Sequence, residues 1–449
     1  MRTVTLSVGR PVAALARTAV AAAAVALAGA LPAAAQAAPQ PVKGDTAWMM
    51  VSTILVLFMI LPGVALFYGG LVRTKNMLSV LMQSTAITAL AIVLWVIYGY
   101  SFAFGGGDSP FWGGLGKLFL AGVGPDSTAA TFTDGVVIPE YVFIAFQMTF
   151  AAITAVLIIG GFAERVRFGA VMAFMAGWLT LVYFPVAHMV WDGAGLIFNL
   201  GALDFAGGTV VHINAGIAAL VGALIIGPRI GYGRDMLAPH SLTLTLVGAG
   251  ILWVGWFGFN AGSNLEANGG AALAMINTFT ATAGAILAWI VIEKLARGKA
   301  SLLGAASGMI AGLVAVTPAA GTVGPVGAIV LGALASAGCF LAVGPVKNAL
   351  GHDDSLDVFG IHGVGGIIGA IGTGIFTAPG LGGTGGDDYS LIGQTLIQIE
   401  AVAITIIWCG VVSWLLYKLV DAVIGLRVPE EDEIEGLDQS SHGERAYHY

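Results

Sequence analysis

The sequence is dominated by apolar runs that are long enough to cross a lipid bilayer. A transmembrane helix needs about 20 mainly apolar residues, and windows of about 19 residues find eleven such runs. Lipid offers no partners for backbone groups, so only helices or closed barrels can cross it, and long runs without alternation indicate helices. The runs are 46–71, 77–104, 141–162, 168–190, 206–227, 241–262, 269–292, 301–319, 324–346, 357–377 and 391–420. The sequence therefore predicts an all-α polytopic membrane protein with eleven transmembrane helices.

The composition excludes the main classes of soluble protein. Only 10% of the 449 residues are charged, against about 25% in soluble domains. The formal charge of −7, without clusters of Lys and Arg, argues against binding of nucleic acid. Cys339 and Cys409 both lie inside apolar runs and lack the spacing of a metal site or a disulfide framework, so we interpret them as small core residues.

Residues 1–37 have the pattern of a cleaved secretory signal. Arginines lead into an alanine-rich stretch from Thr18 to Leu31, and Ala35-Gln36-Ala37 has the small residues that signal peptidase requires. The alternative is an uncleaved first helix, but this stretch is shorter than a membrane span. Cleavage would leave a mature chain that begins at Ala38 with its N-terminus outside the cell.

The basic residues predict the orientation of the chain. Cytoplasmic connections of membrane proteins carry an excess of Lys and Arg. Of the 18 basic residues, three lie in the signal segment and 13 of the other 15 fall on one side of the predicted spans. These 13 are Arg73, Lys75, Arg165, Arg167, Arg229, Arg234, Lys294, Arg297, Lys299, Lys347, Lys418, Arg427 and Arg445. Only Lys43 and Lys117 fall on the other side, so we expect the N-terminus outside and the C-terminus inside.

Two glycine-rich segments, one after His212 and one after His362, indicate an internal repeat. Glycine and isoleucine recur at the same offsets, as Gly216, Ile217, Gly222 and Ile225 in the first and Gly366, Ile367, Gly372 and Ile375 in the second. The segments belong to the fifth and tenth predicted spans, which run in opposite directions. Two inverted five-helix repeats, about 46–227 and 241–377, with an extra helix at 391–420, form a known transporter architecture whose site lies near the bilayer midplane.

His212 and His362 are the histidines that lie deep in predicted spans. An ionisable group within a span is costly unless it faces a polar cavity or a partner, so it is a functional hypothesis by default. Two neutral imidazoles can pass a proton or contact a small polar guest. The alternative is two separate helix-packing histidines, because inversion permits contact without requiring it. A metal site is not expected, since no third ligand stands at helical spacing.

Aromatic and polar residues gather at the outward ends of three predicted spans. They are Phe146 and Phe150 on the third, Trp191 on the fourth, and Trp256, Phe259, Asn260 and Ser263 on the sixth. Aromatic faces attract cations, most strongly when the site is partly desolvated. An interfacial aromatic belt is the alternative, but the polar residues beside the rings favour a vestibule that binds a cation.

These segments resemble the ammonium transporter (Amt) family, closely its bacterial members, over nearly all of the mature chain. The most specific run is Asp204-Phe-Ala-Gly-Gly-Thr-Val-Val-His212-Ile-Asn-Ala-Gly216. Supporting runs are Leu66–Gly70, Ala187–Trp191, Gly255–Ser263, Asp357–Gly363 and Gly425–Glu431. The resemblance implies a homotrimer in the cell inner membrane with one pore per subunit, formed by residues 38–424.

The resemblance also implies roles for individual residues. Phe146, Trp191 and Ser263 would form the external recruitment site for ammonium, Phe150 and Phe259 a stacked gate, and His212 and His362 a twin-histidine pair in the lumen. Asp204 matches a carboxylate that organises the vestibule, and Tyr68 and Trp256 match positions that flank the lumen. Met148 stands where a small residue is expected, which leaves the shape of the vestibule open.

The expected function is transport of ammonium, and of methylammonium, without enzymatic activity or cofactors. Ammonium would bind outside and deprotonate near the gate, and ammonia would cross while the proton travels separately or remains outside. An apolar lumen penalises an unpaired ion far more than neutral ammonia, which would exclude potassium. The alternatives are an Rh-type gas channel, which should lack Trp191, and a sensor without flux, which should carry a long cytosolic domain.

Residues 425–449 form the predicted cytoplasmic tail. The acidic run from Glu430 to Glu435 is typical of a solvated end. By the family resemblance, this segment packs under the pore and couples to a PII-type signalling protein of nitrogen metabolism that blocks the inner mouth. We predict no function for the outward loop, residues 105–137.

Overall fold

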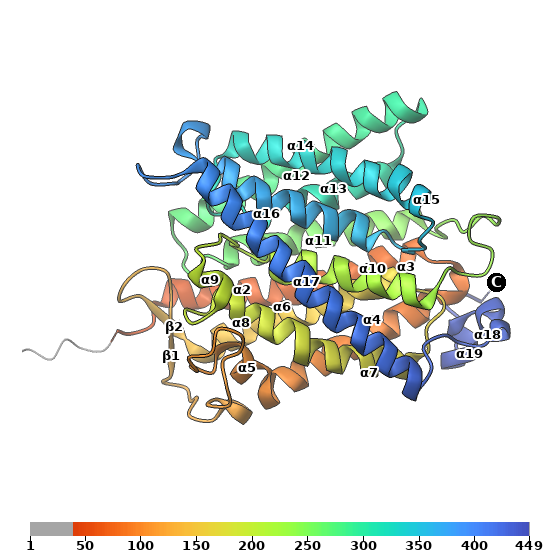
Figure 1. The fold of residues 1–449 in the computed structure, drawn as a ribbon, viewed down its shortest axis with the longest axis horizontal. Coiled ribbons are helices and arrows are strands. Elements are labelled where there is room, and N and C mark those ends of the chain that lie inside the picture. The colour runs from red at the N-terminus through yellow and green to blue at the C-terminus, as the bar shows by residue number, and fades with distance from the viewer. Residues whose placement is uncertain (1–38, 449) are drawn as a thin grey trace, which may run out of the picture. The chain divides into compact units, whose positions relative to one another are not determined.

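The computed structural model describes residues 39–448, and the predicted signal segment lies outside them (Figure 1). Pro41–Tyr449 forms one compact unit. Ten of its described helical segments are long and apolar enough to cross a membrane. They are Lys43–Leu71, Thr74–Phe104, Glu140–Gly161, Phe168–Asn199, Gly208–Ile226, Leu242–Gly262, Gly269–Arg297, Pro325–Leu350, Phe359–Phe376 and Leu391–Val423. The chain therefore has a polytopic helical membrane fold.

Regular α-helix makes up most of these segments. In chain order the helices are α2 (Lys43–Phe58), α3 (Ala65–Leu71), α4 (Met77–Leu94), α5 (Tyr100–Phe104), α6 (Glu140–Ile158), α7 (Phe168–Trp178), α8 (Phe184–Trp191), α9 (Leu196–Asn199), α10 (Asn214–Ile226), α11 (Leu242–Gly262), α12 (Gly269–Arg297), α13 (Leu302–Val316), α14 (Pro325–Leu341), α15 (Lys347–Leu350), α16 (Val364–Phe376), α17 (Leu391–Val423), α18 (Glu430–Glu435) and α19 (Leu437–His442). Strands β1 (Thr128–Ala130) and β2 (Val137–Pro139) pair antiparallel in the loop that leads into α6.

Helix α13 is shorter than the run 301–319 that predicted it. Its 15 residues rise about 22 Å at 1.5 Å per residue, less than the roughly 30 Å of a hydrocarbon core. The chain continues from Thr317 to Val323 as turns that are mostly buried rather than as helix. Irregular backbone at this depth is tolerated where protein surrounds it, and here it places Thr317 beside the histidines.

Six of the ten segments contain a π-helical turn, where the backbone accommodates an extra residue. The turns are Met59–Val64, Trp95–Gly99, Leu179–Tyr183, Gly208–Ile213, Ala342–Val346 and Phe359–Gly363. Turns of this kind are often found at functional sites. His212 and His362 each lie within one of them.

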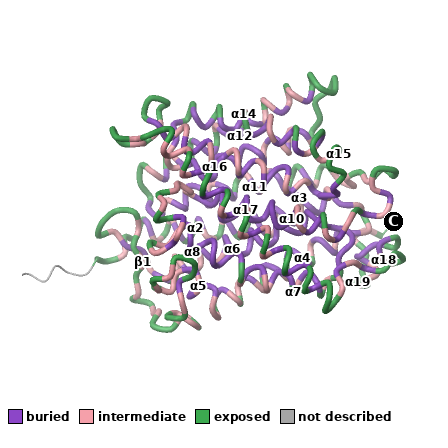
Figure 2. The backbone as a smooth tube through the Cα atoms, in the orientation of Figure 1, coloured by how far each residue is buried: buried purple, intermediate pink, exposed green. Residues whose placement is uncertain are grey.

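The segments differ in how far protein encloses them. In α6 and in the segment of α10, 78% of the most apolar window is buried, against 33% in α12 and α17. Figure 2 shows the same contrast, with buried backbone along α6 and α10 and exposed stretches on α17. Because a helix that is apolar all round suits either a protein core or lipid, composition alone does not separate these two environments.

Glycines bring the two histidine-bearing segments together. A Cβ atom on Gly216 would overlap the backbone of Gly363, and one on Gly366 would lie 3.1 Å from both Gly208 O and His212 Cβ. Small residues let helix backbones approach closely in membranes. Glycines therefore form the contact between the two segments, with Gly216 of α10 against the Phe359–Gly363 turn and Gly366 of α16 against the Gly208–Ile213 turn.

The end of the chain is docked, so the prediction of a solvated acidic tail is wrong for part of it. Glu433 and Asp438 are 1% and 2% exposed. The Asp438 carboxylate accepts hydrogen bonds from the N–H groups of Leu78 (3.0 Å) and Ser79 (2.7 Å) in the first turn of α4. The first N–H groups of a helix lack partners within it and attract negative charge. Figure 1 shows α18 and α19 folded back beside the transmembrane helices.

Candidate functional site

Three cavities follow one another through the bundle, and each is named here for what lines it. The aromatic cavity, of about 570 Å³, includes Phe146, Trp191 and Ser263 in its wall. The narrow cavity, of about 10 Å³, includes His212, Trp256 and Phe259. The ionic cavity, of about 400 Å³, includes Arg229, Lys347 and Asp357. The narrow cavity has about the space that a single water molecule requires.

The three residues predicted for recruitment of ammonium share the wall of the aromatic cavity. Phe146 comes from α6, Trp191 from the end of α8, and Ser263 from the end of α11. The Ser263 hydroxyl donates to Phe259 O at 2.8 Å, which leaves its oxygen lone pairs as acceptors. The wall thus combines aromatic faces with an oxygen that can accept from a cationic N–H group.

Two stacked phenylalanine rings separate the aromatic cavity from the narrow cavity. The centroids of Phe150 and Phe259 lie 4.2 Å apart with the rings inclined by 23°. Trp191 meets Phe150 edge to face at 5.8 Å. Both phenylalanine side chains are fully buried, so the stack closes the passage in this conformation.

Asp204 joins the aromatic cavity to the turn that carries His212. Its Oδ1 accepts from the N–H groups of Gly207 (2.8 Å) and Gly208 (2.6 Å). Its Oδ2 accepts from the Thr209 N–H at 2.8 Å and from the Thr209 hydroxyl. The Trp191 indole N–H donates to the Asp204 backbone carbonyl at 2.9 Å. Asp204 therefore caps the N-terminus of the segment Gly208–Ile226 with its side chain and holds the Trp191 indole with its backbone carbonyl.

Two details of the predicted vestibule differ in the structure. Asn260 does not line the aromatic cavity, because its amide turns to Thr278 Oγ1 at 2.9 Å and the residue is fully buried. Trp256 lines the narrow cavity instead of the vestibule, which matches the position implied by the family resemblance. Met148 is a half-buried residue of α6 that packs against the core and does not line the aromatic cavity, so it does not alter the shape of that cavity.

The two histidines meet in the wall of the narrow cavity. Their Nδ1 atoms are 3.3 Å apart, within hydrogen-bond distance, and the residues are 1% and 4% exposed. The His212 ring stacks on Trp256 with a centroid distance of 5.5 Å. The contact that the sequence left open is therefore made. Among residues 39–448, no group of three or more His, Cys, Asp or Glu side chains is arranged to hold a metal ion.

The other polar groups of the narrow cavity point into the protein. The Tyr68 hydroxyl donates to Leu157 O at 2.9 Å, and the Trp256 indole N–H donates to Thr317 Oγ1 at 2.9 Å. Both residues line the narrow cavity, but only their apolar surfaces remain for a guest. The polar character of the narrow cavity therefore comes from the histidines.

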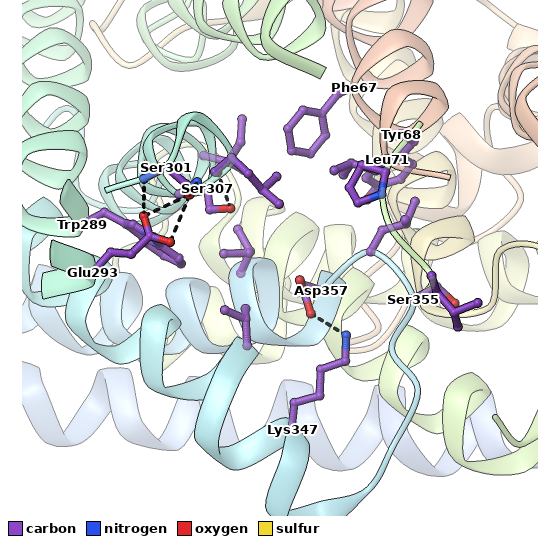
Figure 3. Close-up of a pocket in the computed structure, with 18 of the residues that line it drawn as sticks. Phe67, Tyr68, Leu71, Trp289, Glu293, Ser301, Ser307, Lys347, Ser355 and Asp357 are labelled. Carbon is purple, nitrogen blue, oxygen red and sulfur yellow. Dashed lines mark hydrogen bonds and ion pairs between the residues drawn. The ribbon is translucent and has the colours of Figure 1, made fainter. Parts of the chain in front are cut away.

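The ionic cavity, shown in Figure 3, is surrounded by charged groups that pair with one another. Lys347 Nζ lies 2.7 Å from Asp357 Oδ1, and the figure shows the two side chains pointing together. The buried Glu293 carboxylate accepts from the Ser301 N–H at 2.9 Å at the start of α13. His362 and Tyr68 line this cavity as well as the narrow one, which places the two next to each other.

A buried ion network beside the ionic cavity was missed by the sequence analysis. Arg229 lies 2.8 Å from Asp353 and 3.3 Å from Glu164, and Arg73 lies 2.8 Å from Glu164. Burial alone would raise the pKa of Glu164 and of Asp353, but the guanidinium groups outweigh it and lower the pKa of both carboxyls. The available signal was an acid next to basic residues in connections that otherwise predicted only orientation.

Comparison with known proteins gives consistent matches. The model of the Ammonium Transporter Family matches residues 47–447. An ammonium transporter of Aquifex aeolicus is 50% identical over 405 residues, which covers 90% of this chain and 93% of the relative. One of Bacillus subtilis is 47% identical over 411 residues, covering 90% and 98%. The crystal structure of Saccharomyces cerevisiae Mep2 gives a TM-score of 0.79 at 36% identity, covering 88% and 89%. A sensor Amt protein gives 0.81 at 28% identity, covering 89% and 98%.

Proposed function

The chain belongs to the ammonium transporter family, and on that premise we propose that it binds ammonium in the aromatic cavity, deprotonates it near the Phe150–Phe259 stack and passes ammonia beside His212 and His362. The relatives are named for transport and not for an enzymatic reaction. The observation that carries the proposal is the succession of cavities, in which a wide aromatic chamber leads through a closed stack to a passage of about 10 Å³.

Selectivity follows from what each cavity offers a cation. Trp191 and Phe146 attract any small monovalent cation, potassium included. The narrow cavity has no charged side chain to replace the water that an ion loses, so entry of an ion is far more costly than entry of ammonia. Ammonium can lose a proton and enter as a neutral molecule, whereas potassium cannot. The proton travels separately or remains outside.

We place the aromatic cavity on the periplasmic side and the ionic cavity on the cytoplasmic side of the inner membrane. The excess of Lys and Arg in connections on the ionic side supports this orientation. Helix α13 with the buried turns after it counts as an eleventh crossing. The π-helical turns of the fourth and ninth and of the fifth and tenth crossings agree with inverted repeats, whereas those of the first and second have no counterpart in the described residues of the sixth and seventh. A signal cleaved after residue 37, a membrane domain at 38–424 and a homotrimer complete the proposed architecture.

The docked tail, residues 425–449, is the proposed contact for a PII-type partner. Arg427 pairs with Glu433 at 2.8 Å, and the Glu433 carboxylate also accepts from the Ile230 N–H at 2.8 Å, so the tail is tied to the connection that borders the ionic cavity. A pull-down of the full chain with a PII protein under nitrogen-replete conditions should recover a complex. A failure under those conditions contradicts the partner.

The proposal is tested by reconstituting the chain in liposomes and measuring currents evoked by ammonium, methylammonium and potassium. We expect the first two to be taken up, with a current only where the proton follows, and potassium to be neither taken up nor to evoke a current, and His362→Ala to weaken ammonium transport or its selectivity while the protein stays folded as a trimer. His240→Ala, which changes a histidine outside the three cavities, is the matched control. Unchanged currents and unchanged potassium exclusion in His362→Ala would refute the role of the pair.

The same preparation separates the alternatives. The likeness to a sensor Amt protein favours, as second candidate, binding of ammonium without significant flux. Saturable binding with no current and no uptake in the wild type would support that candidate. An Rh-type gas channel would instead move ammonia without charge and without a saturable ammonium site. The charge moved per ammonium taken up distinguishes electroneutral conduction from net ammonium transport.

A further inference from the structure

Thr317 is the contact that makes the two histidines different from each other. It directly follows α13 and is fully buried. Its Oγ1 lies 2.8 Å from Leu313 O, 2.9 Å from Trp256 Nε1 and 3.3 Å from His212 Nε2. His362 has no equivalent contact among residues 39–448, where its recorded hydrogen bond is the one to His212.

The direction of two of these hydrogen bonds is settled by chemistry. An indole N–H can only donate and a carbonyl oxygen can only accept, while a hydroxyl has one hydrogen and two lone pairs. The Thr317 N–H bonds to Val314 O at 3.2 Å instead of closing a helical bond to Leu313 O. The hydroxyl hydrogen therefore goes to Leu313 O, and one lone pair takes the indole N–H of Trp256.

The second lone pair of Thr317 Oγ1 faces His212 Nε2, so that nitrogen must carry a hydrogen to bond with it. We propose that Thr317 sets the tautomer of the histidine pair, with His212 protonated at Nε2 and His362 protonated at Nδ1. A neutral His212 that carries its hydrogen on Nε2 presents a lone pair at Nδ1. His362 Nδ1 then donates to it across the 3.3 Å contact.

In this arrangement, His362 Nε2 is the one of the four ring nitrogens of His212 and His362 whose lone pair has no hydrogen-bond partner among the described residues. His362 lines both the narrow and the ionic cavity, whereas His212 lines only the narrow one. Both nitrogens of His212 are engaged by protein, so an N–H group of ammonia can donate only to His362. The inverted repeat makes the two histidines alike in sequence, and Thr317 gives them unequal tasks. The tautomers follow from the hydrogen bonds alone, whereas their role in transport rests on the proposed function.

The opposite tautomer meets a penalty. It would set the His212 Nε2 lone pair against a hydroxyl oxygen, or turn the hydroxyl hydrogen from Leu313 O and leave a buried carbonyl without its partner. A buried hydrogen bond of this kind contributes about a fivefold bias in an equilibrium. The preference is therefore large enough to be seen as a single dominant tautomer.

The experiment is nitrogen-15 NMR of histidine-labelled protein in lipid bilayers, which distinguishes protonated from unprotonated ring nitrogens. The wild type should show hydrogen on His212 Nε2 and His362 Nδ1. Thr317→Val keeps the shape and removes the hydroxyl, so a mixture of tautomers should appear, and Thr317→Ser should restore the wild-type pattern. Thr405→Val is the matched control, because that buried hydroxyl also donates to a carbonyl four residues earlier but does not line the narrow cavity.

Ammonium current supplies the second measurement. Thr317→Val should reduce it by up to about twofold, because loss of a fivefold bias lowers the population of the preferred tautomer from about 83% to about 50%, while Thr317→Ser and Thr405→Val should stay near the wild type. Wild-type spectra with His212 Nε2 unprotonated, or unchanged tautomers in Thr317→Val, would overturn the inference even if transport is normal. A wild type with the expected tautomers but no flux would support the inference and contradict only the proposed function.

Discussion

The aromatic and ionic cavities are of similar size, about 570 Å³ and 400 Å³, but their walls differ in the kind of side chain that lines them. The wall of the aromatic cavity is made mainly of rings, and its one carboxylate, Asp204, is bound by backbone N–H groups. The ionic cavity is bordered by Lys347, Asp357 and Arg229, each with an oppositely charged partner.

The difference indicates that the aromatic cavity serves to bind the cation and that the charged groups of the ionic cavity serve to stabilise the fold. Rings attract a cation while their own burial costs little, so they can form a site that stays open to solvent. Buried charges are stable only when they are paired, and a pair that loses one partner is strongly destabilising. Variants near the ionic cavity should therefore change the stability of the fold, and variants in the aromatic cavity should change the affinity for ammonium.

The largest effect is expected from Arg229→Met. It removes the partner of Asp353 and one partner of Glu164, two carboxylates that are 1% and 2% exposed. Such a loss costs about 3–5 kcal/mol of the free energy of unfolding. Thermal unfolding of the purified protein measures it, with the exposed Arg234→Met as control. Reduced affinity for ammonium at unchanged stability would break the comparison.

A pH dependence is expected from Asp354, a buried carboxyl between α15 and α16. Burial raises its pKa from 3.8 to about 6, against the opposing charge of Lys347. The protonated form is thus favoured in the fold, so its contribution to stability is complete below 3.8 and is lost as pH rises through about 6. Asp354→Asn removes this dependence, and its stability relative to the wild type should rise by up to about 3 kcal/mol between pH 4 and pH 7.

Glu164 provides the control of opposite sign. Its pKa is lowered in the fold, so its contribution is present above the ordinary value and is lost as pH falls through the folded value. Chemical unfolding at a series of pH values should therefore give opposite trends for Asp354→Asn and Glu164→Gln, each compared with the wild type. Parallel trends would contradict the assignment of the two carboxyls.

Trp191→Leu should change affinity with little effect on stability. Loss of a cation–π contact of about 0.5–2 kcal/mol raises the ammonium concentration for half-maximal current about 2- to 30-fold. Trp191→Phe keeps a ring and should show part of the increase. Concentration dependence of the current in proteoliposomes provides the measurement. An unchanged half-maximal concentration would show that the Trp191 ring does not take part in binding ammonium.

Ser263→Ala should have the smallest effect of the set. Its hydroxyl oxygen accepts one hydrogen bond from ammonium in a cavity where water can replace it, so the loss is about 1 kcal/mol or about fivefold in affinity. Met148→Ala is the control, because that side chain does not line the aromatic cavity. An increase of half-maximal concentration in Met148→Ala equal to that in Ser263→Ala would show that the effect is not local.

The fold was predictable wherever it depended on local composition. Ten of the eleven apolar runs appear as helical segments long enough to span. The run 301–319 was predicted as well, but its helix stops at Val316, because hydropathy reports apolar character and not the point where helical hydrogen bonds end. The tail was predicted as solvated from the acidic run Glu430–Glu435, whereas the hydrogen bonds that Glu433 and Asp438 accept from Ile230 and Leu78 come from segments over 200 residues away.

By itself, the sequence determined that lipid surrounds this chain, where its helices run, and which two histidines lie deep within them. Those properties follow from apolar length and spacing along the chain, which are local. Only the tertiary structure decided that the histidines touch, that Asn260 turns away from the vestibule, and that Thr317 bonds one histidine and not the other. These contacts depend on where helical segments cross, and the crossing of Gly208–Ile226 and Phe359–Phe376 is set by Gly216 and Gly363, which meet across 147 residues of sequence.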